Sequence, residues 1–320
     1  MNDGLYFVSF VLNAYKFCTL RQCFDMAIMK PPIRLLTAKD IPGALRLTQV
    51  AKWNQTAQDW KNLLEFEPYG CFGVDLDGNL VGTATAVRFE PKSGPGSLGW
   101  IGMALVDPEC RRHEIDSVLL KKCLDYLRAQ QVETVRLDTP LMSKHLYDQL
   151  GFVVEYALER WEGTAHKVPG AVKGPWTLGA LTPADLEQLA EYDHPVFGTD
   201  RQKVLGAFIK DWPEQALAAR GPKGGLVGYA LARRGGSYEQ IGPLVGDNAA
   251  ICEALLLEQL ARLAGKRVSV DLITEQAWIK PLAERCGLRH QRPFLRMAQG
   301  PHSAPGKQVK AAAIGGSELG

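Results

Sequence analysis

The sequence lacks the long apolar runs and the excess of one charge that mark membrane proteins and nucleic-acid-binding proteins. Its N-terminal apolar stretch, residues 4–12, is far too short to span a bilayer. The 37 lysines and arginines nearly balance the 35 aspartates and glutamates, which gives a net charge of +2 and a pI of about 8.1. This balance gives no indication of a nucleic-acid-binding surface. We therefore expect neither a membrane nor a nucleic acid as a partner.

Signatures of metal sites and of two large enzyme classes are also missing. The seven cysteines include no C-x-x-C pair, and none is grouped with histidine at zinc-binding spacing. An odd number of cysteines without a disulfide framework fits a reduced, cytosolic compartment. The sequence contains neither the G-x-S-x-G motif of serine hydrolases nor a Walker phosphate loop. We expect no metal, and a function outside these two classes.

The first 32 residues have the character of an N-terminal extension. Asp3 has the wrong charge for the start of a secretory signal peptide. The low acidic content leaves a mitochondrial presequence open, although only Lys16, Arg21 and Lys30 are basic. We expect a cytoplasmic protein, with a mitochondrial location as the weaker alternative.

Residues 100–120 have the pattern of a strand, a basic loop and a helix. Residues 101–106 are an apolar run of strand length, and Pro108 ends it because proline lacks the amide that strand pairing needs. Arg111 and Arg112 follow, and then apolar residues recur at helical spacing. Such a loop offers backbone amides and the positive end of a helix to a phosphate. An ordinary strand-to-helix crossover would have the same pattern.

Val106, Pro108 and Arg111 match the acetyl-CoA-binding motif of the GNAT acetyltransferase superfamily. In that motif a strand ends in V-x-P and the next helix opens with R/Q-x-x-G-x-G/A. The stretch resembles this family, and the resemblance implies acetyl-CoA as the acetyl donor. The residues that it places at the cofactor are Ala104, Leu105, Val106, Arg111, Arg112, His113, Glu114, Ile115, Asp116 and Ser117.

Glu114 and Asp116 stand where the family has glycine. Glycine there lets the backbone approach the pyrophosphate closely. A carboxylate about 5 Å from a phosphate charge would repel it by roughly 1–3 kcal/mol at an effective dielectric of about 20–80. A second hypothesis is therefore a catalytically weakened GNAT-fold protein that binds a metabolite or a partner.

A second motif, HLYDQLGF at residues 145–152, resembles the family's L-Y-x-x-L-G-F element. The resemblance implies that Tyr147 is the general acid that protonates the departing thiolate. The residues alone also allow a tyrosine that packs under the sheet with its hydroxyl at the rim. The general base is not identified, with Asp138 and His145 as weak candidates.

Three polar residues are weak candidates for substrate contacts. Asn54 lies on a probable loop before a helix, where it could instead be a cap. Asp200 lies in a turn-rich segment, residues 193–201, of the kind that often carries function, and it too could be a cap. Asp138, at the end of an expected strand, is the third candidate.

The second half of the chain repeats the first. Residues 241–245 echo residues 101–106, and Asp271 matches Asp138. The repeat predicts an α/β (α+β) fold of two tandem GNAT-like domains, each a separate, twisted mixed sheet flanked by helices. The expected boundaries are an N-terminal extension at 1–32, a GNAT domain at 33–162, a linker at 163–175, a second GNAT-like domain at 176–298 and a disordered tail at 299–320.

The second copy lacks the basic loop, so we expect it to be degenerate and without a cofactor of its own. It would supply a wall of the substrate cleft, since binding sites favour domain interfaces. The chain as a whole is expected to be an acetyl-CoA-dependent N-acetyltransferase that acts on an amine of a small molecule or a peptide. We expect it to be a monomer or a homodimer.

Overall fold

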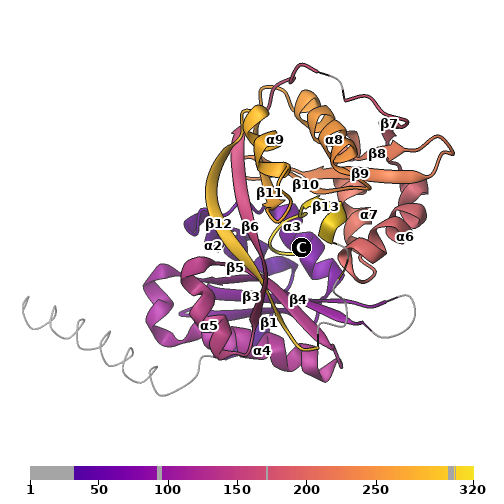
Figure 1. The fold of residues 1–320 in the computed structure, drawn as a ribbon. Helices are drawn as coiled ribbons and strands as arrows, with labels where there is room; N and C mark the ends of the chain where they lie inside the picture. The colour runs from indigo at the N-terminus through magenta and orange to yellow at the C-terminus, as the bar shows by residue number, and fades with distance from the viewer. Residues whose placement is uncertain (1–31, 92–95, 171, 302–305, 307) are drawn as a thin grey trace, which may run out of the picture.

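The computed structural model describes residues 32–91, 96–170, 172–301, 306 and 308–320. Apart from Pro32, the expected N-terminal extension lies outside these residues. Within them the chain forms two halves of mixed strands and flanking helices that pack against each other (Figure 1). The predicted α/β class is therefore confirmed.

Local sequence explains the turns and helix starts of the first half. Thr56 begins α3 (Ala57–Phe66) with a capping box, in which its amide and hydroxyl donate to the carboxylate of Asp59. The hairpin of β2 (Cys71–Leu76) and β3 (Asn79–Phe89) turns at Asp77 and Gly78, both with positive φ, as a type I′ turn requires. The other elements are β1 (Ile33–Leu35), α2 (Ile41–Val50), β4 (Leu98–Val106), α4 (Ile115–Ala129), β5 (Thr134–Pro140), α5 (Lys144–Gln149) and β6 (Val153–Thr164).

The second half repeats this order element by element, which confirms the predicted repeat. Its elements are β7 (Thr177–Ala180), α6 (Leu186–Phe197), α7 (Gln202–Asp211), β8 (Leu217–Arg220), β9 (Leu226–Arg233), β10 (Glu239–Gly246), α8 (Ala249–Arg262), β11 (Arg267–Ile273), α9 (Ile279–Arg285) and β12 (Arg289–Gln299). A short additional strand, β13 (Ala311–Ala313), follows. The boundaries expected for the two domains stay a prediction.

The two halves exchange their last strands. The described strands form one 13-stranded sheet in the order β1-β2-β3-β4-β5-β12-β6-β11-β13-β10-β9-β8-β7. β12 of the second half pairs with β5 of the first, and β6 of the first half pairs with β11 of the second. Figure 1 shows β6 and β12 running side by side between the halves. The expectation of two separate sheets is therefore wrong, because strand periodicity does not specify which neighbour a strand pairs with.

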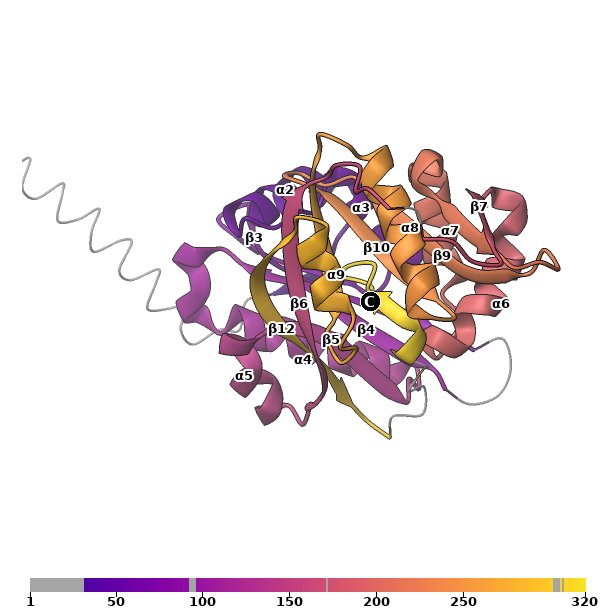
Figure 2. The same ribbon diagram turned by 45° about the horizontal axis from the view of Figure 1, so that its top comes forward.

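The C-terminal stretch fills a gap in the sheet. β10 and β11 pair in parallel only at one end, and β13 pairs with both of them where they separate. In Figure 2, β13 is the yellow strand near the C-terminus, and it pairs with β10. Ala312, Ala313 and Ile314 are buried there. The expected disordered tail is therefore wrong for residues 308–320. The alanines of β13 are small enough for the narrow gap between the strands. A run of alanines shows no alternation of apolar and polar residues, so the sequence did not indicate a strand.

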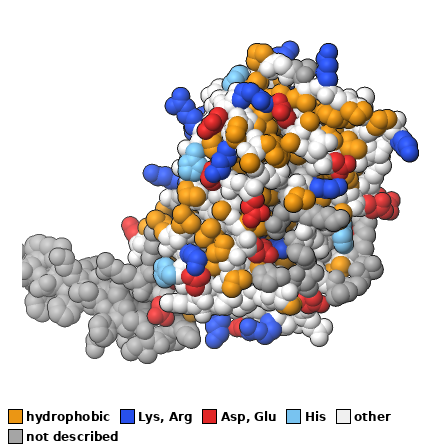
Figure 3. Space-filling model, viewed as in Figure 1, with side chains coloured by type: hydrophobic (Ala, Val, Ile, Leu, Met, Phe, Trp, Pro, Cys, Tyr) orange, Lys and Arg blue, Asp and Glu red, His pale blue; other side chains and the backbone are white. Residues whose placement is uncertain are grey.

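The halves also share a hydrophobic core. Phe197 of the second half packs edge-on against Phe89 of the first, with ring centroids 5.3 Å apart, and stacks with Trp100 at 6.2 Å. Trp60 from α3 and Leu319 from the C-terminal stretch belong to the same buried cluster. On the face shown in Figure 3, side chains of both charges are interspersed, as the small net charge of the chain suggests.

Candidate functional site

The main candidate site is a cleft where β4 and β5 separate. These parallel strands pair only from Leu98 to Trp100 and from Thr134 to Arg136, and they diverge beyond. The cleft holds about 910 Å³ of empty space, part of it open to solvent. Its walls come from both halves. The lining residues are Trp53, Asn54, Gln55, Ile101, Gly102, Met103, Ala104, Leu137, Asp138, Thr139, Pro140, Ser143, Tyr147, Arg160, Arg292, Phe294, Ser317 and Glu318.

Tyr147, the expected general acid, lies in this cleft. α5 brings its side chain to the cleft wall, where its ring packs edge-on against Phe152 with centroids 6.0 Å apart. Burial raises the pKa of Tyr147 to about 12. A hydrogen bond with Thr139 acts to lower this pKa, but the effect of burial is larger. The phenol is therefore protonated at neutral pH and can serve as a proton donor.

The expected cofactor loop has the predicted strand, loop and helix arrangement. Ala104 of β4 lines the cleft, Val106 ends the strand, and residues 108–113 form a short 3₁₀ turn before α4. Leu105 and Ile115 are buried in the core and are not among the residues that line the cleft. The side chains of Arg111, Arg112 and His113 lie outside the described part of the structure.

Glu114 and Asp116 act on the start of α4 in different ways. Glu114 adopts a left-handed conformation, with φ of 53°, at the position where the family motif has glycine. The backbone there thus keeps a conformation that glycine favours. Asp116 places its carboxylate on the backbone amide of Ser117, at 2.8 Å. That amide is one of the free donors at the helix start that a phosphate would otherwise use.

Asp138 reaches the cleft but is held by an arginine from the other half. Its two carboxylate oxygens accept hydrogen bonds of 2.8 and 2.9 Å from Arg296 on β12. Burial raises the pKa of Asp138, although Arg296 acts to lower it. The second half has the equivalent pair, in which Arg160 on β6 holds Asp271 on β11.

The other weak candidates have structural contacts. Asn54 lines the cleft, but its side-chain amide bonds to the backbone of Ser237 and Tyr238 in the β9–β10 connection, at 2.8–3.2 Å. Asp200 does not line the cleft; it accepts the amide of Gln202 just before α7, whose N-cap is Arg201. His145 is exposed and does not line the cleft either.

Three charged cleft residues were not found from the sequence. Glu318 is 4% exposed, accepts a hydrogen bond of 2.9 Å from Gln55, and forms an ion pair of 3.0 Å with Arg233. Glu318 is the single acidic residue among the last 20 residues, and this isolated carboxylate was the one sequence feature that could have indicated a functional residue there. Arg160 and Arg292 lie on the exchanged strands β6 and β12, so no sequence pattern placed them in the cleft.

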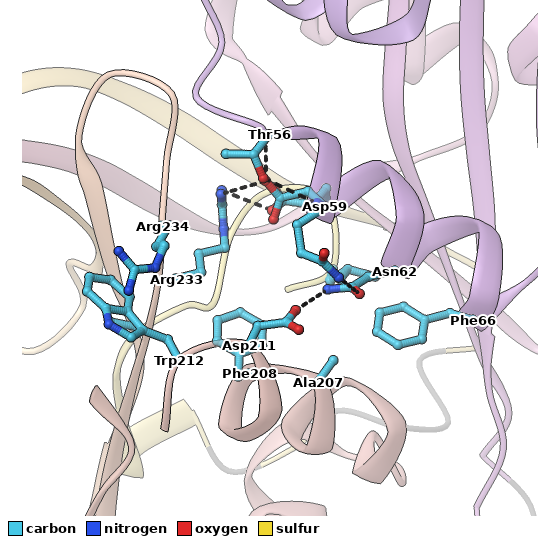
Figure 4. Close-up of a pocket in the computed structure, with 14 residues that line it drawn as sticks. Thr56, Asp59, Asn62, Phe66, Ala207, Phe208, Asp211, Trp212, Arg233 and Arg234 are labelled. Carbon is cyan, nitrogen blue, oxygen red and sulfur yellow. Dashed lines mark hydrogen bonds and ion pairs between the residues drawn. The ribbon is translucent and has the colours of Figure 1, made fainter. Parts of the chain in front are cut away.

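A second cavity of about 600 Å³ lies between α3 and α7 (Figure 4). Asn62 of α3 donates to Asp211 of α7 at 2.7 Å across it. The guanidinium of Arg234 stacks on Trp212, 4.6 Å from the ring centroid. Glu318 borders both this cavity and the main cleft. The cavity is thus a feature of the junction between the halves.

The place in the second half that corresponds to the cleft is filled. β13 occupies the gap between β10 and β11, and Asn248 caps α8 by accepting the amide of Ile251 at 3.0 Å. That this half has no cofactor of its own stays a prediction, and the plug is an observation in its favour. The described residues contain no cluster of three or more histidines, cysteines or carboxylates that could hold a metal. Among them, no helix combines the length and apolar character of a membrane span.

Comparisons with known proteins agree with this architecture. The holothin acyltransferase of Pseudoalteromonas sp. (strain SANK 73390) is 23% identical over 277 residues, which cover 84% of this chain and 87% of that protein. The uncharacterized N-acetyltransferase YitH of Bacillus subtilis (strain 168) is 24% identical over 244 residues, which cover 75% of this chain and 81% of that protein.

Solved structures show the same fold. A putative acetyltransferase from Pyrococcus horikoshii matches with a TM-score of 0.76 and 23% identity, over 92% of this chain and 97% of that one. A tandem GNAT protein from the clavulanic acid biosynthesis pathway matches with a TM-score of 0.57 and 14% identity, over 84% of this chain and 99% of that one.

Family matches cover both halves. Residues 43–152 match the acetyltransferase (GNAT) family, and residues 189–310 match an acetyltransferase (GNAT) domain. Together they span well over half of the chain. The chain therefore belongs to the GNAT acetyltransferase family, with two GNAT domains in tandem, and is an acyltransferase.

Proposed function

We propose that this acyltransferase uses acetyl-CoA to acetylate an amine of a small molecule or a peptide in the cleft between β4 and β5. The observation that carries the proposal is the position of Tyr147, a buried phenol in the wall of that cleft with its pKa raised to about 12. The family match supports acyl transfer in general. The tyrosine supports the assignment of the chemistry to this cleft rather than to the second cavity.

The residues of the cleft fit the thioester end of coenzyme A. Residues 101–106 of β4 do not pair with β5, which leaves space for a ligand between the two strands. Ala104 and Met103 line the cleft on the same strand. The start of α4 suits the diphosphate, although Asp116 already occupies the amide of Ser117. Acetyl-CoA would supply the activated acetyl group.

The protein's own groups then handle the protons. Tyr147 holds a proton on its phenolic oxygen for the departing sulfur. Asp138 and Glu318 are the carboxylates that line the cleft in the described structure, and we place the exit of the ammonium proton at this pair. Each of the two carboxylates is held in place by an ion pair with an arginine.

The alternative is a GNAT-fold protein that has lost most of its activity and binds a metabolite or a partner. The carboxylate of Asp116 on the Ser117 amide favours it, because this contact competes with a phosphate for the same donor. Two measurements on the full chain separate the possibilities. Calorimetry with acetyl-CoA measures cofactor binding, and release of free thiol in the presence of a panel of amines measures turnover.

We expect micromolar to millimolar binding of acetyl-CoA and amine-dependent thiol release. Binding without release for every amine would support the alternative. No binding up to millimolar acetyl-CoA would overturn the proposal. We further propose that the protein acts in the cytoplasm as a monomer or homodimer.

A further inference from the structure

Two arginines from the exchanged strands lie side by side in the main cleft. Arg160 on β6 and Arg292 on β12 are cross-strand partners, and both line the cleft. They come from different halves of the chain, so the exchange of strands brings them together. The two guanidinium groups differ sharply in the partners that surround them.

Each of the three guanidinium nitrogens of Arg160 has a hydrogen-bond partner. Its Nε and Nη2 each donate to Asp271 at 2.7 Å, and its Nη1 donates to the hydroxyl of Tyr238 at 2.9 Å. It is 8% exposed. The positive charge of Arg160 is therefore balanced inside the protein.

The guanidinium of Arg292 has no hydrogen bond or ion pair with any residue in the described part of the chain. Its Nε is buried without a partner. Burial, followed by the charge of Arg160, lowers the pKa of Arg292, while Tyr238, Asp271 and Glu162 act in the opposite direction. An arginine stays protonated despite such a shift, so the cleft contains a cation that forms no ion pair with a described residue.

The other charges of the cleft form closed pairs. Asp138 is paired with Arg296, and Glu318 is paired with Arg233. With Arg160 held by Asp271, the charge of Arg292 alone is left over among the described lining residues. A half-buried, unpaired guanidinium is unfavourable for the empty protein, which suggests that it is kept for a ligand.

We propose that the acceptor amine carries an oxyanion group, a carboxylate or a phosphate, which Arg292 binds in the cleft. This rests on the proposed function and names the chemical class of its substrate. A guanidinium presents a planar fork of N–H donors that matches both oxyanions. Tyr147 lines the same cleft, so the anionic end and the reacting end of one small acceptor share a single space.

The direct test is calorimetry on the full chain with pairs of amines that differ only in the anionic group. 4-Aminobutanoate is compared with 4-aminobutanamide for the carboxylate, and O-phosphoethanolamine with ethanolamine for the phosphate. Chain lengths from 3-aminopropanoate to 6-aminohexanoate sample the distance between the two ends. We expect at least one acid to bind ten times more tightly than its neutral partner, with the preference shrinking at high salt.

Variants assign the preference to the residue. Arg292→Gln should reduce the tenfold preference to less than twofold, and Arg292→Lys should keep part of it, because a lysine retains the charge but not the fork. Arg289→Gln is the matched control, since Arg289 is an exposed arginine of β12 that does not line the cleft. It should leave the preference unchanged.

Stability distinguishes a ligand-binding arginine from a structural one. Removing an unpaired, half-buried charge should leave the melting temperature of the free protein unchanged or higher in Arg292→Gln. A lower melting temperature, or equal binding of acids and neutral partners by the wild type, would overturn the proposal. So would an acid preference that survives in Arg292→Gln.

Turnover separates this inference from the proposed function. With acetyl-CoA present, Arg292→Gln should raise KM for the preferred acid about tenfold with little change in kcat. If acids bind through Arg292 but no amine is acetylated, the anion site stands and the acetyltransferase proposal fails. If only neutral amines are acetylated, the acetyltransferase proposal stands and the anion site fails.

Discussion

Arg296 and Asp138 are cross-strand neighbours from opposite halves of the chain, joined by two hydrogen bonds of 2.8 and 2.9 Å. Arg160 and Asp271 form the same pair at the other junction, with two hydrogen bonds of 2.7 Å. In each case the arginine lies on the exchanged strand and the aspartate on the strand that receives it. The two ion pairs therefore accompany the strand exchange symmetrically.

The first prediction concerns the stability of this pair. Arg296→Met leaves Asp138 buried without a counter-charge, and we expect the free energy of unfolding to fall by about 3–5 kcal/mol. The double change Arg296→Met with Asp138→Leu should recover most of that loss, because no charge is then buried alone. Urea unfolding at neutral pH measures both.

The exposed ion pair between Lys144 and Asp148 serves as the control for this prediction. Lys144→Ala breaks an exposed pair with Asp148 and should change the stability by about 0.5 kcal/mol or less. If the double variant were as unstable as Arg296→Met, the ion pair itself would be needed for folding rather than merely costly to break.

The second prediction concerns Tyr147. Tyr147→Phe removes the proton donor while it keeps the ring against Phe152, so we expect kcat to fall about 100-fold with little change in KM. Because the pKa of Tyr147 is raised to about 12, the phenol stays protonated and should cause no loss of rate up to about pH 10. Steady-state thiol release across pH measures this.

Tyr69→Phe is the matched control, since Tyr69 is 69% exposed and outside the cleft, and it should leave kcat unchanged. An unchanged kcat in Tyr147→Phe would remove the tyrosine from the chemistry and leave it as a packing residue.

The third prediction concerns the two carboxylates at the start of α4. The double change Glu114→Gly with Asp116→Gly frees the Ser117 amide and removes two negative charges, so it should tighten acetyl-CoA binding at least tenfold, about 1.4 kcal/mol. Glu114→Gln with Asp116→Asn removes charge alone. It should recover part of the gain, and that part should shrink at high salt.

Calorimetry at low and high ionic strength separates these contributions. Glu114→Gly by itself should also stabilise the free protein by about 0.5–1 kcal/mol, since glycine suits the left-handed conformation at that position. An unchanged affinity in the glycine pair would mean that the phosphates bind elsewhere.

The fourth prediction concerns the C-terminal stretch. Leu319 is 8% exposed and belongs to the core shared by both halves, so Leu319→Ala should lower the free energy of unfolding by about 2–3 kcal/mol. Val309→Ala is the control, because Val309 is 79% exposed and its loss should change stability by about 0.5 kcal/mol or less. Equal effects of the two changes in thermal or urea unfolding would contradict the packing of this stretch into the core.

Much of the fold could be read from the sequence because it depends on local patterns. The capping box at Thr56, the Asp77-Gly78 turn and the apolar stripe of α4 each arise from neighbours within a few residues. The placement of Tyr147 followed from a motif whose residues lie on one short helix and the turn after it. Such features are determined by hydrogen bonding and side-chain periodicity along the chain.

The tertiary structure alone decided which strands pair and what the cleft contains. Strand periodicity does not specify which neighbours β6 and β12 pair with, so their exchange depends on packing between segments far apart in the sequence. The same pairing brings Arg292 beside Arg160. The narrow gap between β10 and β11 accommodates the alanine-rich strand β13. The sequence thus determined the elements and the family of the protein, while long-range pairing and burial decided the shape and charge of its site.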